Sequence, residues 1–279
     1  MEMFITNNNI YNNNKNKLYN GYYEMIYNNG SVYKGNWEKG LYHGYGKMIF
    51  NNGLVYKGNW KNGLYHGFGK IYNINGSVYR GNWENGLYNG YGKLTYMNGS
   101  IYKGYFLNNH RHGEGKMTSI NGDIYEGSWI NNNHHGKGKL SLLYGDIYEG
   151  DWVNNHCTGY GKMISSNGNI YEGEWKNDKR HGYGKIIFID DFTYEGMWEN
   201  NLRHGYGKIN YKNGNIYEGH WKNNYFSGYG KMIYNNGEIY EGNWRNQLRH
   251  GNGKIFFSKN SSYKGIWQYD ELLCLETNI

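Results

Sequence analysis

The sequence repeats itself every 23 residues, and this period constrains the fold more than any other feature. Tyrosines stand at that interval, without insertion or deletion, at Tyr33, Tyr56, Tyr79, Tyr102, Tyr125, Tyr148, Tyr171, Tyr194, Tyr217, Tyr240 and Tyr263. With each tyrosine counted as position 0, glycine occupies plus 2 in all eleven units and tryptophan plus 4 in ten, with Phe106 in the remaining unit. Such a register indicates a repeat architecture in which each unit packs on its neighbours.

Each unit contains two short segments with the alternating pattern of β-strands, such as "SVYKGNW" and "GYGKMIF". Between the second segment and the next unit stands "NNG", "ING" or "SNG", which predicts a hairpin turn because Asn and Gly accept positive φ. The sequence leaves open whether this turn is a two-residue type I′ turn or a three-residue turn with a bulge. The cross-strand register is therefore open as well.

Stacking these hairpins predicts an all-β fold, an elongated single-layer antiparallel sheet of about eleven 23-residue β-hairpins. At about 4.8 Å per strand each unit advances roughly 9.6 Å, so the sheet forms a solenoid-like rod of about 105 Å. The chain has 44 glycines, 33 tyrosines and no proline. With so few aliphatic residues, aromatic rings lying over glycines replace the second layer of an ordinary domain.

The pattern divides the chain into three parts. Residues 1–19 form an asparagine-rich tail that we expect to be disordered, residues 20–267 form the repeat array, and residues 268–279 form a C-terminal capping segment. In that segment Leu272, Leu273 and Leu275 cap the last strand as a short helix or bind a partner. Because an open sheet has unpaired edges, we expect self-association, such as a homodimer, through this end.

The repeated "YEGEWKNDKRHGYGK" resembles the MORN repeat, the membrane occupation and recognition nexus family, from about Asn20 to Trp267. The resemblance implies a non-enzymatic scaffold without a cofactor, which binds protein partners such as an extended peptide, a helix or a cytoskeletal component. The predicted protein-binding groove is lined by Tyr125, Trp129, Tyr148, Trp152, Tyr171, Trp175, Tyr194, Trp198, Tyr217 and Trp221.

Other chemistry fits the residues less well. The "HGYGK" stretches lack the spacing of a phosphate-binding loop, and the histidines at plus 10 recur about 9.6 Å apart, too far to share one metal ion. The prediction is therefore no metal site, with one candidate cluster kept open, namely His110, His112, His134, His135, His156 and Cys157. Cys157 and Cys274 are expected to be free thiols.

Charge distinguishes the two parts of the chain. Residues 1–115 hold 12 Lys or Arg against 5 Asp or Glu, a net charge of +7, whereas residues 116–279 hold 18 of each. The N-terminal units are therefore the alternative site, a surface for anionic phospholipids or phosphoinositides. Its predicted residues are Lys34, Lys47, Lys57, Lys70, Arg80, Lys93 and Lys103. The basic residues follow no motif that reads nucleic acid, so no nucleic-acid partner is expected.

No targeting signal or membrane span stands out in the sequence, so we expect a cytoplasmic protein, associated with the cytoskeleton or with a membrane surface. Two functions remain open at this point. One is a scaffold that binds proteins through its aromatic face, and the other is a peripheral protein that binds acidic lipid through its basic units.

Overall fold

A computed structural model describes residues 3–5, 19–257 and 261–275 of the chain. The chain divides into two compact units, residues 1–143 (unit 1) and residues 144–279 (unit 2). All regular structure in the described ranges is β-strand, as predicted, and none of it is a helix that could cross a membrane. The predicted disordered tail falls mostly on residues 6–18, which lie outside the described residues.

The strands of unit 1 are β1 Met3–Ile5, β2 Gly21–Tyr27, β3 Val32–Glu38, β4 Leu41–Ile49, β5 Val55–Lys61, β6 Leu64–Tyr72, β7 Val78–Glu84, β8 Leu87–Thr95, β9 Ile101–Leu107, β10 His110–Thr118, β11 Ile124–Ile130 and β12 Asn133–Ser141. The strands of unit 2 are β13 Ile147–Val153, β14 His156–Ile164, β15 Ile170–Lys176, β16 Lys179–Ile187, β17 Phe192–Glu199, β18 Leu202–Tyr211, β19 Ile216–Lys222, β20 Tyr225–Ile233, β21 Ile239–Arg245, β22 Leu248–Phe256, β23 Ser262–Gln268 and β24 Glu271–Leu275.

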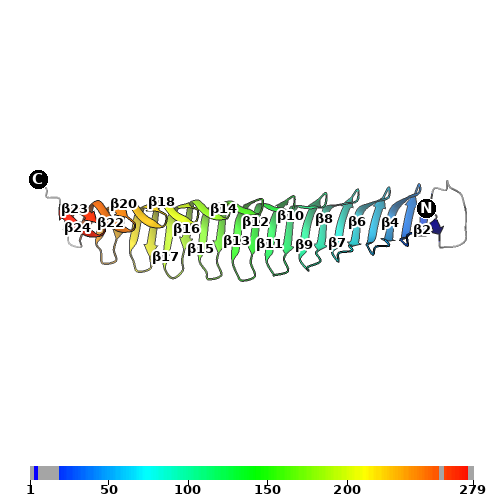
Figure 1. Cartoon of the computed structure of the whole chain (residues 1–279), viewed down its shortest axis with the longest axis horizontal. Helices are drawn as coiled ribbons and strands as arrows, with labels where there is room; N and C mark the ends of the chain where they lie inside the picture. Colours follow the sequence, from blue (N-terminus) through cyan, green and yellow to red (C-terminus); the bar gives the residue numbers. More distant parts are fainter. Residues whose placement is uncertain (1–2, 6–18, 258–260, 276–279) are drawn as a thin grey trace. The chain divides into compact units, whose positions relative to one another are not determined.

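Within each unit, every strand pairs antiparallel with the next strand along the chain (Figure 1). The expected sheet of stacked hairpins is thereby confirmed in both units. Because neighbouring strands are also neighbours in sequence, the 23-residue period of the chain becomes a two-strand period of the sheet.

Two kinds of turn alternate along each sheet. The turn that the sequence predicted is a three-residue one: the amide of Phe50 donates to Leu54 O at 2.8 Å, and Gly53 has a φ of 88°. The second kind was missed. Between β5 and β6 only Asn62 and Gly63 separate the paired Lys61 and Leu64, and both have positive φ, the geometry of a type I′ turn.

The two turns settle the open register and put plus 0, plus 2 and plus 4 on one face of the sheet, here called the inner face. In the repeat that begins at Tyr171, Gly173 pairs directly with Gly184, and the Tyr171 ring lies on both. The Tyr171 hydroxyl donates to Glu174 O at 2.9 Å. The glycines therefore provide the space in which a buried tyrosine ring lies flat against the backbone.

The C-terminal segment differs from expectation. Instead of a short helix, residues Glu271–Leu275 form strand β24, which pairs with β23 across a two-residue turn. The turn residues Tyr269 and Asp270 have φ values of 50° and 72°, like the type I′ turns of the earlier repeats. The last unit thus completes a hairpin, and its leucines belong to a strand.

Candidate functional site

The inner face carries a continuous floor of aromatic rings. Within each unit, most tyrosines at plus 0 pack edge-on against the aromatic plus 4 residue of their own repeat and of the next one. In unit 2 the Tyr194 ring centroid lies 5.2 Å from that of Trp198 and 5.1 Å from that of Trp221. The Trp221 indole N–H donates to Gly207 O at 3.0 Å, so the floor is joined to the backbone as well. Each ring therefore has a fixed place, set by two repeats at once.

The residues predicted to line a protein-binding groove form this floor. Nine of the ten are buried, with exposed fractions of 0 to 5 %, and Trp175 is the one that is partly exposed. A buried ring makes few direct contacts with an outside molecule. These residues support the surface of the inner face, and Trp175 alone among them reaches it.

The side chains that lie over this floor stand at plus 9, a position that the sequence did not single out, and all of them are partly exposed except Phe226, which is buried. The type I′ turn places plus 9 directly opposite plus 4, as Trp37 opposite Tyr42, so its side chain lies on the floor. We call these residues the lids. They are Tyr42, Tyr65, Tyr88, Arg111 and His134 in unit 1, and Cys157, Arg180, Arg203, Phe226 and Arg249 in unit 2.

Aromatic lids stack flat on the tyrosine of their own repeat. The Tyr56 and Tyr65 rings are 3.9 Å apart with an angle of 18°, and the Tyr217 and Phe226 rings are 3.7 Å apart with an angle of 15°. The His134 ring stacks on Tyr125 at 3.6 Å. Burial, aided by the positive charge of Arg111, lowers the pKa of His134 to about 4.

Three of the four arginine lids, Arg111, Arg180 and Arg203, cover the tryptophan of the next repeat. The guanidinium carbon of Arg203 lies 4.5 Å from the ring centroid of Trp221. Arg203 Nε donates to Asn224 Oδ1 at 3.3 Å and Nη2 donates to Asn224 O at 3.4 Å. Arg180 makes the same contacts with Trp198 and Asn201. The guanidinium is thus held between an aromatic face and two acceptors of the following turn.

The opposite, outer face carries the charge pattern. In unit 1 the cross-strand neighbours at plus 1 and plus 14 form one uninterrupted row of cations, in the order Lys34, Lys47, Lys57, Lys70, Arg80, Lys93, Lys103 and Lys116. Glu24 pairs with the first at 2.9 Å and Glu126 with the last at 3.1 Å. The row contains all seven residues predicted to contact lipid.

In unit 2 the same row alternates in sign from Glu149 to Lys254 and ends with Lys264 opposite Lys254. Lys208 lies 3.4 Å from Glu218, and Lys231 lies 2.7 Å from Glu241. Beside the row, plus 12 is often an exposed aromatic residue, such as Phe68 in unit 1 and Tyr206 in unit 2, with exposed fractions of 50 and 52 %. Basic and aromatic side chains therefore adjoin on the outer face of the first three repeats of unit 1, where plus 12 is Tyr45, Phe68 and Tyr91, whereas the fourth repeat has Glu114 there.

The residues considered as metal ligands make other contacts. His156 Nδ1 lies 2.6 Å from Asp178 Oδ2, and burial raises the pKa of the Cys157 thiol to about 12. Cys157 and Cys274 are free thiols, as expected. Among the described residues no three His, Cys, Asp or Glu side chains are placed to hold a metal ion together.

Several solved structures resemble part of this arrangement. One is the TCP10 domain of Danio rerio CPAP, with 12 % identity, a TM-score of 0.40 and coverage of 71 % of this chain and 93 % of that one. A second is the same domain in complex with a peptide of Danio rerio STIL, with 9 % identity, a TM-score of 0.34 and coverage of 91 and 98 %. A third is virginiamycin B lyase from Staphylococcus aureus, with 13 % identity, a TM-score of 0.16 and coverage of 95 and 96 %. At such TM-scores nothing about function follows. No curated protein matches the chain.

The family comparison is specific. The MORN repeat model matches ten successive segments, at residues 33–55, 56–78, 79–101, 102–124, 125–142, 148–170, 171–191, 194–216, 217–239 and 240–262. The sequence predicted about eleven units, and the additional one is the β23–β24 hairpin, which begins at the end of the last matched segment. Most of the chain is covered, and the chain belongs to the MORN-repeat family.

Proposed function

We propose that this MORN-repeat protein is a non-enzymatic scaffold that binds an extended protein segment along the inner face of unit 2. The observation that carries the proposal is the row of lids. Cys157 and Arg180, which differ in size and charge, stand at equivalent, partly exposed positions on the same aromatic floor, whereas Phe226 at the equivalent position is buried. The repeats therefore keep one support and vary the side chain that faces outward.

The physical case rests on preorganisation and composition. A lid that is already held by stacking and hydrogen bonds loses little further freedom when a partner binds, which lowers the entropic cost of association. Arginine and aromatic side chains are also the types enriched at the centres of protein interfaces. In unit 2, Arg180 and Arg203 are partly buried yet remain accessible at the surface.

Site-specific photo-crosslinking tests this proposal. We would introduce p-benzoylphenylalanine in place of Arg203 on the inner face, or in place of Tyr206 on the outer face of the same hairpin, in cells that produce the protein. We expect a discrete crosslinked partner from position 203 and none from position 206. Crosslinks from position 206 alone, or equally from both, would place the binding surface elsewhere.

The row of cations supports a second function, contact between the outer face of unit 1 and an acidic lipid surface. Each basic group near such a surface contributes roughly 1 kcal/mol, and the interaction weakens within a Debye length. The six residues from Lys47 to Lys103 have no carboxylate among their cross-strand neighbours in the row. Their charges are therefore available to an external anion.

The test uses the full chain with vesicles of phosphatidylcholine alone or with added phosphatidylinositol phosphate. The variant Lys57→Glu, Arg80→Glu, Lys103→Glu gives unit 1 the alternating pattern that unit 2 already has. We expect the wild type to sediment with the acidic vesicles in a salt-sensitive manner and the variant to remain in solution. Equal sedimentation of both proteins would contradict a role for the row.

A further inference from the structure

One lid of unit 2 is too short to cover its tryptophan. Each lid stands 18 residues before the tryptophan that it covers, as Arg180 does for Trp198. The same spacing assigns Cys157 to Trp175. All ten tryptophans lie in the described part of the chain, and Trp175 is the only one whose side chain is not buried.

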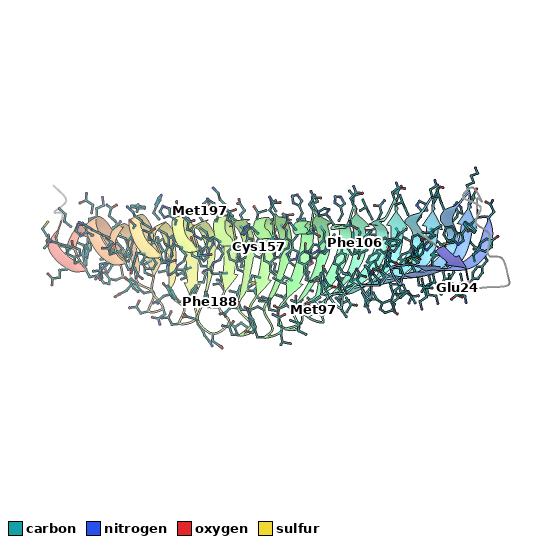
Figure 2. All side chains as sticks on the ribbon, turned by 45° about the vertical axis from the view of Figure 1, so that its right-hand side comes forward. Glu24, Met97, Phe106, Cys157, Phe188 and Met197 are labelled. Atoms are coloured by element: carbon teal, nitrogen blue, oxygen red, sulfur yellow. The ribbon has the colours of Figure 1, made fainter. Side chains whose placement is uncertain are left out.

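A hollow lies beside Trp175. Its volume is about 220 Å³. Its walls include Met163, Ser165, Tyr171, Trp175, Ile186 and Phe188. Position plus 17 contributes to the opening, because Ser165 stands where the next two repeats have Phe188 and Tyr211. Cys157 is the second residue of β14, next to the two-residue turn, whereas Phe188 lies toward the edge formed by the three-residue turns (Figure 2).

The neighbouring repeats show which group fits such a place. In the next two repeats a guanidinium lies on the tryptophan face and donates to the plus 7 residue of the following repeat. Arg249 makes the same pair of hydrogen bonds to an aspartate: Nε donates to Asp270 Oδ1 at 3.0 Å and Nη2 to Asp270 O at 3.2 Å. The chain itself thus provides the binding pose of an arginine side chain.

In the repeat that contains Trp175 the plus 7 acceptor is present, but the lid 18 residues before this tryptophan is Cys157 instead of an arginine. Asp178 is the plus 7 residue there, and its Oδ1 accepts the amide of Cys157 at 2.7 Å, as Asp270 Oδ1 accepts the amide of Arg249 at 2.8 Å. Burial opposes ionisation of Asp178, but hydrogen bonds from His156 and Cys157 outweigh it and lower the pKa of the carboxyl. A negative charge therefore stands at the plus 7 acceptor position of the repeat that contains Trp175.

We propose that the hollow over Trp175 binds an arginine side chain of the partner protein, whose guanidinium occupies the place that Arg180 and Arg203 fill in the next two repeats. This inference rests on the proposed function, because it names one contact of the segment bound along the inner face. The guanidinium stacks on Trp175 and donates toward Asp178, while its methylenes contact Met163 and the adjoining apolar wall.

Arg180, which also borders the hollow, is compatible with this occupant. Its own guanidinium lies over Trp198, 4.5 Å from the ring centroid. Arg180 and Arg203 already stand in successive repeats, each on its own tryptophan, so the sheet accommodates arginines at this spacing. Lysine fits less well, because a compact ammonium neither stacks nor donates from two positions in a fixed plane.

The test follows the indole N–H signals of the ¹⁵N-labelled full chain during titration with N-acetyl-arginine amide. Trp175→Phe identifies the signal of Trp175 by its disappearance. N-acetyl-lysine amide and N-acetyl-leucine amide are the comparison probes. We expect a saturable shift of the Trp175 signal with the arginine probe, at an affinity at least about tenfold higher than for either comparison probe.

Two variants of the lid make the result decisive. Cys157→Arg supplies the chain's own guanidinium and is expected to abolish the shift and raise the Tm, whereas Cys157→Ser leaves the hollow open and keeps the shift. An unmoved Trp175 signal, an equal response to the leucine probe, or an undiminished shift in Cys157→Arg overturns the arginine site. If crosslinking from position 203 nevertheless succeeds, the scaffold function stands and only this contact is wrong. If crosslinking fails while the Trp175 signal shifts, the hollow binds arginine but the proposed scaffold function along the inner face is wrong.

Discussion

The Tyr171 ring lies so close to Gly184 that a Cβ atom on that glycine would stand 2.4 Å from the tyrosine hydroxyl oxygen. No real Cβ is found at such a distance, so either the ring or the strand would have to move. The equivalent pair recurs in neighbouring repeats, for example Tyr194 with Gly207 at 2.4 Å. The spacing between ring and backbone therefore depends on glycine at this position.

Gly184→Ala is expected to lower the free energy of unfolding by about 3 kcal/mol, because the added methyl overpacks the site beneath a buried ring. Gly53→Ala is the matched control, since Gly53 has a φ of 88° and a Cβ atom there would meet nothing within 4 Å. That control should cost only about 1 kcal/mol, for the positive φ alone. Urea denaturation measures both, and equal losses would show that ring clearance is not what the glycine provides.

His134 predicts a pH dependence of stability. Burial and Arg111 lower its pKa from 6.5 to about 4, so the unfolded chain binds the proton more tightly than the folded one. Stability from this group is complete above about pH 6.5 and is lost as the pH falls toward 4, by about 2 kcal/mol after allowance for partial exposure.

The control for this prediction is His134→Tyr, because tyrosine is the lid of three other repeats and does not titrate in this range. The difference in Tm between wild type and variant should widen between pH 6.5 and pH 4. A constant difference across that range would mean that His134 is protonated equally well in the folded protein.

The row of cations predicts an unusual response to salt. Lys57 pairs with Lys47 on one side and Lys70 on the other, and like charges directly opposite destabilise a sheet. Adding salt should therefore raise the Tm of the wild type. Lys57→Glu should stabilise the protein by roughly 0.5 to 1 kcal/mol at low salt and reduce the response.

Glu218→Lys is the reciprocal variant, because Glu218 lies between Lys208 and Lys231. It should lower the Tm at low salt and make stability more dependent on salt. Differential scanning fluorimetry across a salt series measures both variants. If the two substitutions shift the Tm in the same direction, the alternation of charge is not what sets these energies.

Strand β24 predicts self-association. All five of its residues are exposed, including Leu273 at 58 %, and among the described residues it pairs only with β23. An open apolar edge is a template for another strand. We expect a concentration-dependent increase in mass by sedimentation velocity, abolished by Leu273→Lys and unaffected by Leu143→Lys, whose leucine is 74 % exposed at a turn of unit 1. Association that survives Leu273→Lys would locate the contact elsewhere.

The sequence predicted the repeat, the antiparallel strands and the role of the glycines, because each of these is written in a pattern that recurs in every unit. It missed the type I′ turn at Asn62–Gly63, although an Asn-Gly pair between two strands was the signal that could have revealed it. It also read the leucines after Trp267 as a helix, because a single short segment has no neighbouring copy to set its period.

The candidate site was harder to predict for a physical reason. Which residue lies on Trp37 depends on the bulge that brings Tyr42 opposite to it, and that register follows from backbone geometry rather than from the identity of either residue. The tyrosines and tryptophans stood out because they recur, and recurrence marked the packed floor. The lids vary from repeat to repeat, so they carry no periodic signal.

The spacing of the lids in unit 2 has a consequence for the kind of partner sequence that can bind there. Successive lids are separated by two strands, a step of about 9.6 Å. A chain in the polyproline II conformation places every third side chain on one side, about 9.3 Å apart. If a segment in that conformation bound across the strands, every third residue of the segment would face a lid, and each such residue would face a different repeat. Substituting a single lid, such as Cys157, would then change which residue is preferred at one position of the bound segment and leave the preferences at the other positions unchanged.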